Sequence, residues 1–379
     1  MVERPAREAG GYRYRRVGAW QLSESGQSTG DTSETPAGIN PDEVAPWLAA
    51  HIDGLQPPLS YSQITGGHSN LTYLVTDAAG GRWVLRRPPL GQVLATAHDM
   101  SREHAIISAL GPTDVPVPPV VGLSSDDSVN GAPFYVMDYV DGVVVRDHTV
   151  AETLSEAQRA RAGESLVEVL GRIHAVDVDA VGLGELGRKE EYLQRQLKRW
   201  NRQFEQSRTQ VAPGSLPDLG ALHRRLLAQV PPQQAATIVH GDYRLDNTML
   251  GPDGSVIAVL DWEICTLGDP LADVGLLLCY WPDPGDAAAM PQVSTVGLPG
   301  FPRRAELLDA YRQVSNLDLS AIDYYMAFGY WKLGCIIAGV YARYAGGSMG
   351  EAGREGAEGF RTMIEGIEAL AYSALEQTT

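Results

Sequence analysis

The sequence is short of cysteine, of long apolar runs and of positive charge. Its three cysteines, Cys265, Cys279 and Cys335, are scattered and form no Cys-x-x-Cys pair, so neither a disulfide framework nor a zinc motif is expected, and a reducing compartment fits best. No run of about 18 apolar residues occurs, so no membrane span is predicted. With 30 basic and 47 acidic side chains the net charge is −17, which argues against nucleic acid as a partner because phosphate binding needs clustered Lys and Arg.

A widespread catalytic motif is also missing. There is no P-loop of the Gly-x-x-x-x-Gly-Lys-[Ser/Thr] type, so a P-loop enzyme is not expected. The chain does contain 44% hydrophobic residues, enough for a sizeable core. At roughly 100–200 residues per domain, the length of 379 residues indicates two domains or one two-lobed unit.

Residues 1–38 are predicted to be a disordered tail. Residues 21–38 are rich in Ser, Thr and Gly and almost free of apolar side chains, so they cannot bury enough surface to offset the entropy of ordering. The first 19 residues carry five arginines against two glutamates, which is weakly similar to an organelle-targeting peptide. We interpret this segment as a solvated tail or a misassigned start, and we expect a cytoplasmic protein.

Residues 39–140 are predicted to form a small β-rich domain that opens with a short helix. Short apolar runs separated by turn residues such as Asp77–Gly81 indicate strands, and Pro88 and Pro89 end the third of them. The predicted elements are strands over 59–65, 71–76 and 82–87, a helix over roughly 96–110, and extended segments over 115–123 and 133–140.

Residues 141–379 are predicted to be mainly helical. Apolar residues recur at i, i+3, i+4 and i+7, the pattern of a helix with one buried face. Thr153 and Glu156 are interpreted as a capping box before the first such helix, and a hairpin stretch over 238–262, with Asp253-Gly254 at its turn, interrupts the helices. The stripes are Leu166, Val169, Leu170 and Ile173; Leu193, Leu197, Trp200 and Phe204; and Phe360, Met363, Ile364 and Ile367.

The strongest chemical signal is the segment His240–Asn247, which reads HGDYRLDN. In a phosphotransfer loop an Asp orients or accepts the proton of the attacking hydroxyl, and an Asn five residues later reaches a metal ion on the nucleotide phosphates. Asp242 and Asn247 have this spacing. Asp261 follows the apolar run Val256–Leu260, where an ionised carboxylate is costly unless it is paired or binds a metal such as Mg²⁺. Each residue alone is typical of a turn or cap, but together they favour phosphoryl transfer.

Over about residues 55–375 the chain resembles the aminoglycoside phosphotransferase (APH) superfamily, the small-molecule branch of the protein-kinase-like fold. HGDYRLDN and VLDWE are similar to its catalytic and metal loops, and Asp261-Trp262 matches that family where protein kinases have Asp-Phe-Gly. The resemblance implies ATP and Mg²⁺ as cofactors, with Asp242 catalytic and with Asn247 and Asp261 as metal ligands.

The resemblance also implies an α+β, two-lobed, protein-kinase-like fold. A small antiparallel β-rich N-lobe over 39–140 would bind the nucleotide, and a larger, mainly helical C-lobe over 141–379 would hold the catalytic loop, the metal loop and the acceptor site.

Three further segments narrow the resemblance to one branch. Tyr192–Trp200, Leu267–Asp273 and Val84–Pro89 are similar to the kinase domain that is fused to long-chain acyl-CoA dehydrogenases in eukaryotes, and to its stand-alone bacterial relatives. That branch is associated with phosphorylation of hydroxyl groups on 4-hydroxyacyl-CoA. The acceptor implied is therefore the hydroxyl of a small molecule.

The loop between the first two predicted strands is a candidate nucleotide-binding element. Glycines allow the backbone to approach phosphates closely, and amide and hydroxyl groups can donate hydrogen bonds to them. Many hairpins contain Gly-Gly without binding a nucleotide. The support for a nucleotide-binding role comes from the position of this loop, one strand before Arg86. The candidate residues are Gly66, Gly67, Ser69 and Asn70.

Arg86 and Glu103 are candidates for the next part of the nucleotide site. In kinases a strand Lys binds the α- and β-phosphates and pairs with a helix Glu, and the resemblance puts Arg86 and Glu103 in these places. Arg is a competent phosphate ligand, although the same pair is also compatible with a weak surface ion pair. The resemblance assigns the segment 133–140 to the strand before the interlobe hinge, where Met137 and Tyr139 are the candidates and backbone groups bind the adenine edge.

Several polar residues near the catalytic loop have more than one interpretation. Arg244 either neutralises charge on the transferred phosphate or pins the loop to a neighbouring carboxylate. His174 and His240 are expected to be packed and hydrogen-bonded. Asp269 and Asp273 are expected to be mainly structural, holding the catalytic loop and capping the helix that follows.

Residues 188–208 concentrate positive charge, with seven Lys and Arg against three Glu, 7 − 3 = +4. In the resembling fold this insert flanks the acceptor site, where it would repel a cationic aminoglycoside and favour an anionic acceptor such as a CoA thioester. A solvated helix face with i,i+4 pairs explains it nearly as well. An aminoglycoside kinase, mildly favoured by the overall acidity, stays open. So does a nucleotide-binding pseudokinase or sensor, against which the complete set of Asp242, Asn247 and Asp261 argues.

Overall fold

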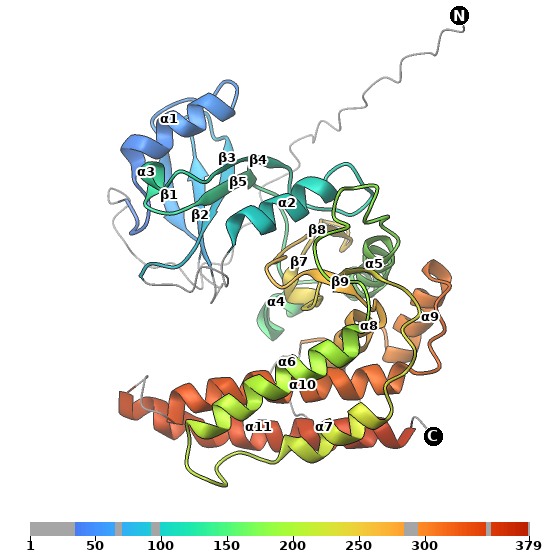
Figure 1. The fold of residues 1–379 in the computed structure, drawn as a ribbon. Helices are drawn as coiled ribbons and strands as arrows, with labels where there is room; N and C mark the ends of the chain where they lie inside the picture. The colour runs from blue at the N-terminus through green and yellow to red at the C-terminus, as the bar shows by residue number, and fades with distance from the viewer. Residues whose placement is uncertain (1–34, 65–69, 92–98, 284–294, 346–349, 378–379) are drawn as a thin grey trace, which may run out of the picture. The chain divides into compact units, whose positions relative to one another are not determined.

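The computed structural model of the chain describes residues 35–64, 70–91, 99–283, 295–345 and 350–377. From Pro36 onward they belong to one unit by their contacts. This unit joins a five-stranded antiparallel sheet to a mainly helical remainder (Figure 1). The two-lobed α+β fold that the sequence predicted is therefore confirmed. Within the described ranges, no helix has the length and apolar character that crossing a membrane requires.

The sheet of the N-lobe has a helix on each face. Its strands are β1 Ser60–Gln63, β2 Leu71–Thr76, β3 Arg82–Arg87, β4 Val120–Ser124 and β5 Phe134–Asp138, in the order β1-β2-β3-β5-β4. Because successive side chains point to opposite faces, Leu85 packs with helix α1 Pro41–His51, whereas its neighbour Val84 belongs to the apolar cluster of helix α2 Met100–Leu110. A short helix, α3 Asp127–Asn130, precedes β5.

Ala37 and Gly38, just before α1, are fixed to this sheet. The Tyr73 hydroxyl donates to the Ala37 carbonyl at 2.6 Å, and the Arg87 guanidinium donates to the Gly38 carbonyl. Ordered contacts therefore begin two residues before the boundary at residue 39 that the sequence suggested.

Three predicted features fall wholly or partly outside the described residues. They are the tail over 1–34, the loop residues Gly66, Gly67 and Ser69, and the first residues of the helix predicted over 96–110. Helix α2 is described from Met100, where the Asp99 side chain accepts the Arg102 amide at 3.1 Å and so caps the first turn.

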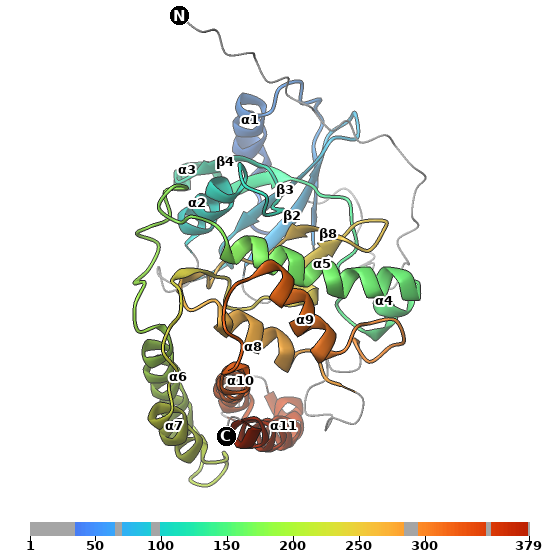
Figure 2. The ribbon, with the colours of Figure 1, turned by 90° about the vertical axis from the view of Figure 1, so that its right-hand side faces the viewer.

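The helices of the C-lobe gather around α10. Helix α10 lies against α6, α7, α8 and α11, and α9 lies against α5; Figure 2 shows α10 and α11 side by side. The apolar stripes predicted in α5 and α6 are buried, as are Ile364 and Ile367 in α11, with Phe360 and Met363 partly buried beside them. The bounds are α4 His148–Glu152, α5 Glu156–His174, α6 Tyr192–Thr209, α7 Leu219–Ala228, α8 Leu271–Cys279, α9 Arg304–Val314, α10 Ile322–Ala345 and α11 Gly350–Gln377.

Two short β-ribbons carry the loops that contain the candidate catalytic residues. The catalytic segment leaves β6 and enters β7 through a 3-10 turn, and Asp261 lies between β8 and β9. Strand β6 pairs with β9 and β7 pairs with β8, so the strand at which each loop starts pairs with the strand at which the other loop ends. The bounds are β6 Thr237–Val239, η1 Leu245–Asn247, β7 Thr248–Leu250, β8 Val256–Val259 and β9 Thr266–Gly268.

The capping box predicted from the sequence is wrong by two residues. Ser155 and Gln158 form it: the Ser155 hydroxyl accepts the Gln158 amide at 3.3 Å, and the Gln158 side-chain oxygen accepts the Ser155 amide at 2.8 Å. Thr153 instead ends α4, so the next helix cannot begin there. The sequence also gave no signal for β9 and α3, because three or four residues are too few for a periodic pattern.

The contact between α8 and α10 leaves no room for a side chain at Gly275. A Cβ atom there would lie 2.5 Å from the Tyr325 carbonyl carbon and 2.6 Å from its oxygen. We expect Gly275→Ala to lower the free energy of unfolding by about 1–3 kcal/mol, measured by urea denaturation, because backbone would have to move. The same change at Gly359 in α11, where nothing lies within 4 Å, should stabilise the helix by about 0.5–1 kcal/mol. Equal effects at both sites would contradict this packing argument.

Candidate active site

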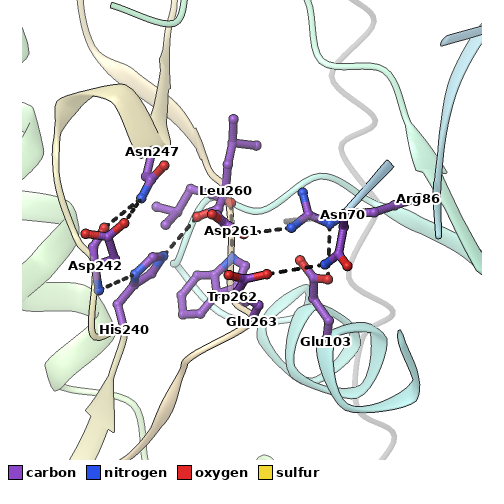
Figure 3. A network of polar contacts seen from close by, with 11 residues as sticks. Asn70, Arg86, Glu103, His240, Asp242, Asn247, Leu260, Asp261, Trp262 and Glu263 are labelled. Atoms are coloured by element: carbon purple, nitrogen blue, oxygen red, sulfur yellow. Dashed lines mark hydrogen bonds and ion pairs between the residues drawn. The ribbon is translucent and has the colours of Figure 1, made fainter. Parts of the chain in front are cut away.

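The catalytic segment brings Asp242 and Asn247 into direct contact. The Asn247 side-chain nitrogen donates to the Asp242 carboxylate oxygen Oδ2 at 2.9 Å and to the Asp242 carbonyl at 2.8 Å (Figure 3). The Asn247 oxygen Oδ1 takes part in neither of these bonds. The spacing that the sequence singled out closes a tight loop, with the amide fixed against the carboxylate.

A buried carboxylate of α8 anchors this loop. Asp273 is 1% exposed; its Oδ2 accepts the His240 amide at 2.7 Å and its Oδ1 accepts the Gly241 amide at 2.8 Å. Burial alone would raise the pKa of Asp273, but the His174 side chain, whose Nε2 lies 3.6 Å from Oδ2, and the backbone amide hold it below the usual value. Asp273 is therefore ionised, in the loop-holding position that the sequence predicted.

Two histidines next to this anchor are packed and bonded. The His240 ring nitrogen Nε2 bonds to the Leu260 carbonyl at 2.9 Å, and the His174 Nδ1 bonds to the Tyr311 hydroxyl at 2.7 Å. His240 ties the catalytic loop to the segment that leads into Asp261 (Figure 3). The prediction that both histidines are packed is confirmed.

Arg244 is held between two carboxylates of its own loop. Its Nε lies 3.3 Å from Asp242 Oδ2, its Nη1 lies 2.9 Å from Asp246 Oδ2, and its guanidinium sits 5.0 Å from the centre of the Tyr280 ring. Burial would lower the pKa of Arg244, but Asp242, Tyr280 and Asp246 together raise it. Of the two interpretations left open by the sequence, this geometry supports pinning of the loop.

Asp261 joins a chain of charges that crosses from the C-lobe to the N-lobe. Its Oδ1 lies 2.7 Å from Arg86 Nη2, and Arg86 Nε lies 3.2 Å from Glu103 Oε2 (Figure 3). The side chains of Arg86 and Glu103 are 15% and 2% exposed, so this is a buried pair and not a surface one. Asp261 also has a positive φ of 63°, a conformation that Asp tolerates better than most residues.

Two more side chains connect the lobes at the same place. The Asn70 side-chain nitrogen lies 3.3 Å from Glu263 Oε2, and Arg102 of α2 donates to the carbonyls of Cys265 at 2.6 Å and Leu186 at 3.0 Å. No motif in the sequence marks Arg102, because its partners are backbone carbonyls far along the chain. Lys332 is not marked by a motif either, since its only local signal is a single charge between Asp323 and Arg343 in an apolar helix.

Met137 and Tyr139 make a separate set of contacts. Met137 pairs with Val84 and Val120 in the sheet, and the Arg82 guanidinium lies 4.3 Å from the centre of the Tyr139 ring. The Tyr139 amide donates to the Arg82 carbonyl at 3.3 Å. The Tyr139 amide therefore already has a hydrogen-bond partner within the sheet.

The donors near Asp242 suit a cation that arrives with phosphates. Among the residues that the structure describes, no group of three or more His, Cys, Asp or Glu side chains could hold a metal ion. Asp261 offers a carboxylate and Asn247 an amide oxygen. Mg²⁺ in phosphotransfer sites is commonly held by one or two carboxylates together with substrate phosphates and water, so this donor set fits Mg²⁺ bound to a nucleotide.

The fold and the loop geometry define a kinase-like phosphotransferase. A solved structure from Ralstonia eutropha JMP134, described provisionally as an aminoglycoside phosphotransferase, is 31% identical to this chain and has a TM-score of 0.74. The match covers 88% of this chain and 99% of that one.

The model of the phosphotransferase enzyme family (APH) matches residues 60–307, and the chain belongs to this family. Acyl-CoA dehydrogenase family member 10 of Mus musculus is 35% identical over 331 residues, which are 86% of this chain and 30% of that protein. Acyl-CoA dehydrogenase family member 11 of Gallus gallus is 32% identical over 339 residues, 85% of this chain and 42% of that protein. The chain thus spans less than half the length of these relatives.

The buried carboxyl of Glu103 should make stability depend on pH. Burial raises the pKa of Glu103 from 4.5 to about 7, although Arg86 opposes the shift. Between these values the folded state holds a proton that the unfolded state has released, so stability falls as the pH rises towards 7. Relative to Glu103→Gln, the wild type should lose up to about 1.4 kcal/mol per pH unit between pH 5 and 7, and nothing further above pH 8.

Urea unfolding at a series of pH values would measure this slope. Glu164→Gln, at an exposed glutamate of α5, is the matched control and should follow the wild type. Parallel curves for the wild type and Glu103→Gln would show that Glu103 does not titrate in this range.

Proposed function

We propose that this protein is an ATP- and Mg²⁺-dependent phosphotransferase that moves the γ-phosphate to a hydroxyl group of a small molecule, with a hydroxyacyl-CoA as the favoured acceptor. The observation that carries the proposal is the Asp242–Asn247 contact, connected through His240 and the Leu260 carbonyl to the segment of Asp261, which itself pairs with Arg86 and, through it, with Glu103. Family membership supports the transfer chemistry, and the donor set supports the magnesium ion.

Asp242 is the proposed base for the acceptor hydroxyl. Asn247 and Arg244 both donate to its Oδ2, at 2.9 and 3.3 Å, so Oδ1 is the oxygen available to the acceptor. Two donors on one oxygen also fix the plane of the carboxylate. The hydroxyl proton would pass to or towards Oδ1 as the hydroxyl oxygen attacks the γ-phosphorus, while the bond from that phosphorus to the bridging oxygen of the β-phosphate breaks and ADP leaves. Most of the catalysis would come from positioning.

Arg86, Glu103 and Asp261 are the proposed nucleotide-phosphate and metal-binding set. Arg86 presents a permanent charge between two carboxylates, and Glu103 holds it from the N-lobe side. Asp261, with the Oδ1 atom of Asn247, would hold Mg²⁺, which neutralises phosphate charge when it is bound. Gly66, Gly67, Ser69 and Asn70 are proposed to approach the phosphates.

The hinge is proposed to bind the adenine edge through the backbone beyond Met137. Because the Asp138 amide donates to the Pro119 carbonyl at 2.8 Å and the Tyr139 amide to Arg82, the carbonyls of these residues and the amide of Val140 are the groups we assign to this contact.

Helix α6 supports an anionic acceptor. Three of the seven cationic residues in 188–208 form ion pairs: Arg188 with Glu191, Lys189 with Asp179, and Arg208 with Glu205. Lys198, Arg199 and Arg202 are exposed and make no ion pair among the described residues, which leaves a positive face on this helix. The acyl-CoA dehydrogenase names of the curated relatives point to the same class of acceptor. The rival acceptor is an aminoglycoside, which the Ralstonia eutropha relative supports.

Phosphate transfer from Mg-ATP to a two-part panel would test the proposal. The panel holds 4-hydroxyacyl-CoAs of several chain lengths and several aminoglycosides. We expect transfer to an acyl-CoA, and we expect Asp242→Ala to reduce it by about 10²–10⁴-fold because the base is lost. Mg-ATP should still raise the melting temperature of both proteins, since binding stabilises the folded state by linkage.

The panel separates the rival functions. Transfer to an aminoglycoside alone would replace the acceptor and keep the mechanism. Nucleotide binding without transfer would favour a sensor, and full activity of Asp242→Ala would refute the role of Asp242.

The positive face of α6 can be tested by charge reversal. We expect Lys198→Glu with Arg202→Glu to raise the KM of an anionic acceptor by about 10-fold at low salt, through lost electrostatic attraction. The effect should shrink at high salt because exposed charges are screened. A control with the same change in net charge, Arg312→Glu with Arg361→Glu on α9 and α11, should leave this KM unchanged. An equal effect of both double variants would show that only net charge matters.

A further inference from the structure

Lys332 is a buried cation that the catalytic scheme above does not use. It lies in α10, it is 7% exposed, and it is the only charged residue between Asp323 and Arg343. A buried ammonium group is costly unless it is paired and hydrogen-bonded. No carboxylate within the described ranges forms an ion pair with it, so its position calls for a different partner.

That partner is the catalytic loop. The Lys332 ammonium donates to the Gly241 carbonyl at 2.7 Å, while the Gly241 amide donates to Asp273 at 2.8 Å. The next amide, that of Asp242, lies 3.3 Å from the His240 ring nitrogen Nδ1. Both ends of the Gly241–Asp242 peptide group are therefore held, its carbonyl by Lys332 and its amide by His240.

The peptide group held in this way sets the direction of the Asp242 side chain. Gly241 has a φ of 85°, so the chain turns sharply at this point and small rotations of the peptide would swing Asp242. Arg244 and Asn247 hold the carboxylate itself, but they belong to the same loop and move with it. Lys332 belongs to α10, a long helix outside the loop, so its bond fixes the position of the loop relative to the core.

The charges around Lys332 agree with this placement. Burial lowers the pKa of Lys332, whereas the carboxylates of Asp242 and Asp273 oppose that shift. The ammonium lies 5.5 Å from the centre of the Trp200 ring, a distance at which a cation is attracted to the ring face. Trp200 belongs to α6, so Lys332 touches both the catalytic loop and the helix with the positive face.

We propose that Lys332 is a positioning residue for phosphoryl transfer, which fixes the Gly241–Asp242 peptide group and so aims the Asp242 carboxylate at the acceptor hydroxyl. The proposal rests on the function proposed above for Asp242. It predicts that loss of the ammonium group affects the rate of transfer and leaves the nucleotide site, built from Arg86 and Glu103, nearly unchanged.

The test compares Lys332→Met, which keeps the length and apolar stem without the charge, with Lys332→Arg, which restores a cationic donor. Arg312→Met is the control, because it removes one exposed positive charge, paired with Asp309 at 2.6 Å on α9, outside both the catalytic loop and the cationic segment 188–208. The first readout is hydrogen exchange of the peptide covering 238–247. The second is the split between kcat and the nucleotide KM, for transfer to the acceptor found in the panel or for nucleotide hydrolysis, where water replaces the acceptor.

We expect Lys332→Met to fold, to exchange the amides of residues 240–247 faster, and to lose about 10²-fold in kcat with a nucleotide KM that stays within about 3-fold, as expected for a misplaced base. Lys332→Arg should recover most of the rate, and Arg312→Met should match the wild type.

Unchanged exchange in the loop, or unchanged kcat despite faster exchange, would overturn the proposal. So would a fall in kcat that Lys332→Arg fails to relieve while exchange stays normal. A wild type that neither transfers nor hydrolyses phosphate would refute the proposed function instead, and the exchange readout would still decide whether Lys332 holds the loop.

Discussion

The paired hydrogen bonds from the His240 and Gly241 amides to the buried Asp273 carboxylate are the constraint on which the site depends. Asp273 is 1% exposed, so water cannot replace either of these hydrogen bonds. Each amide would therefore be left without a partner if the loop moved. The catalytic loop therefore has one favoured position relative to α8. Lys332 donates a further hydrogen bond to the Gly241 carbonyl. The loop is therefore bonded to two helices of the core, to α8 through Asp273 and to α10 through Lys332.

The second constraint is the narrow place where the two lobes meet. Three side chains of the N-lobe reach the segment Asp261–Cys265: Arg86 from β3, Arg102 from α2, and Asn70, the residue just before β2. The buried Arg86 pair is the costliest of these contacts to break, because removing one partner leaves an uncompensated charge. Glu103 of α2 is connected through Arg86 to Asp261, the proposed metal ligand. The neighbouring Leu260 carbonyl is bonded to His240, so the same connection extends to the catalytic loop.

The sequence predicted the parts of this protein that depend on local pattern. Strand β3 has the bounds that the sequence predicted, and the apolar stripe of α6 is buried as its periodicity indicated. The spacing of Asp242 and Asn247 identified a loop that closes on itself. Local signals failed where several residues compete for one role, as at the cap of α5, where Ser155 and not Thr153 binds the first turn.

By itself, the sequence determined a small β-rich part followed by a larger helical part, and the close spacing of Asp242 and Asn247, because periodicity, turn chemistry and short spacings act over a few residues. Only the tertiary structure decided the partners of the buried charges. Arg86 and Asp261 are 175 residues apart, and Lys332 and Gly241 are 91 apart. Such pairs form where folding removes water and brings distant groups together, so burial decides which charges must be bonded, and no local pattern in the chain records that choice.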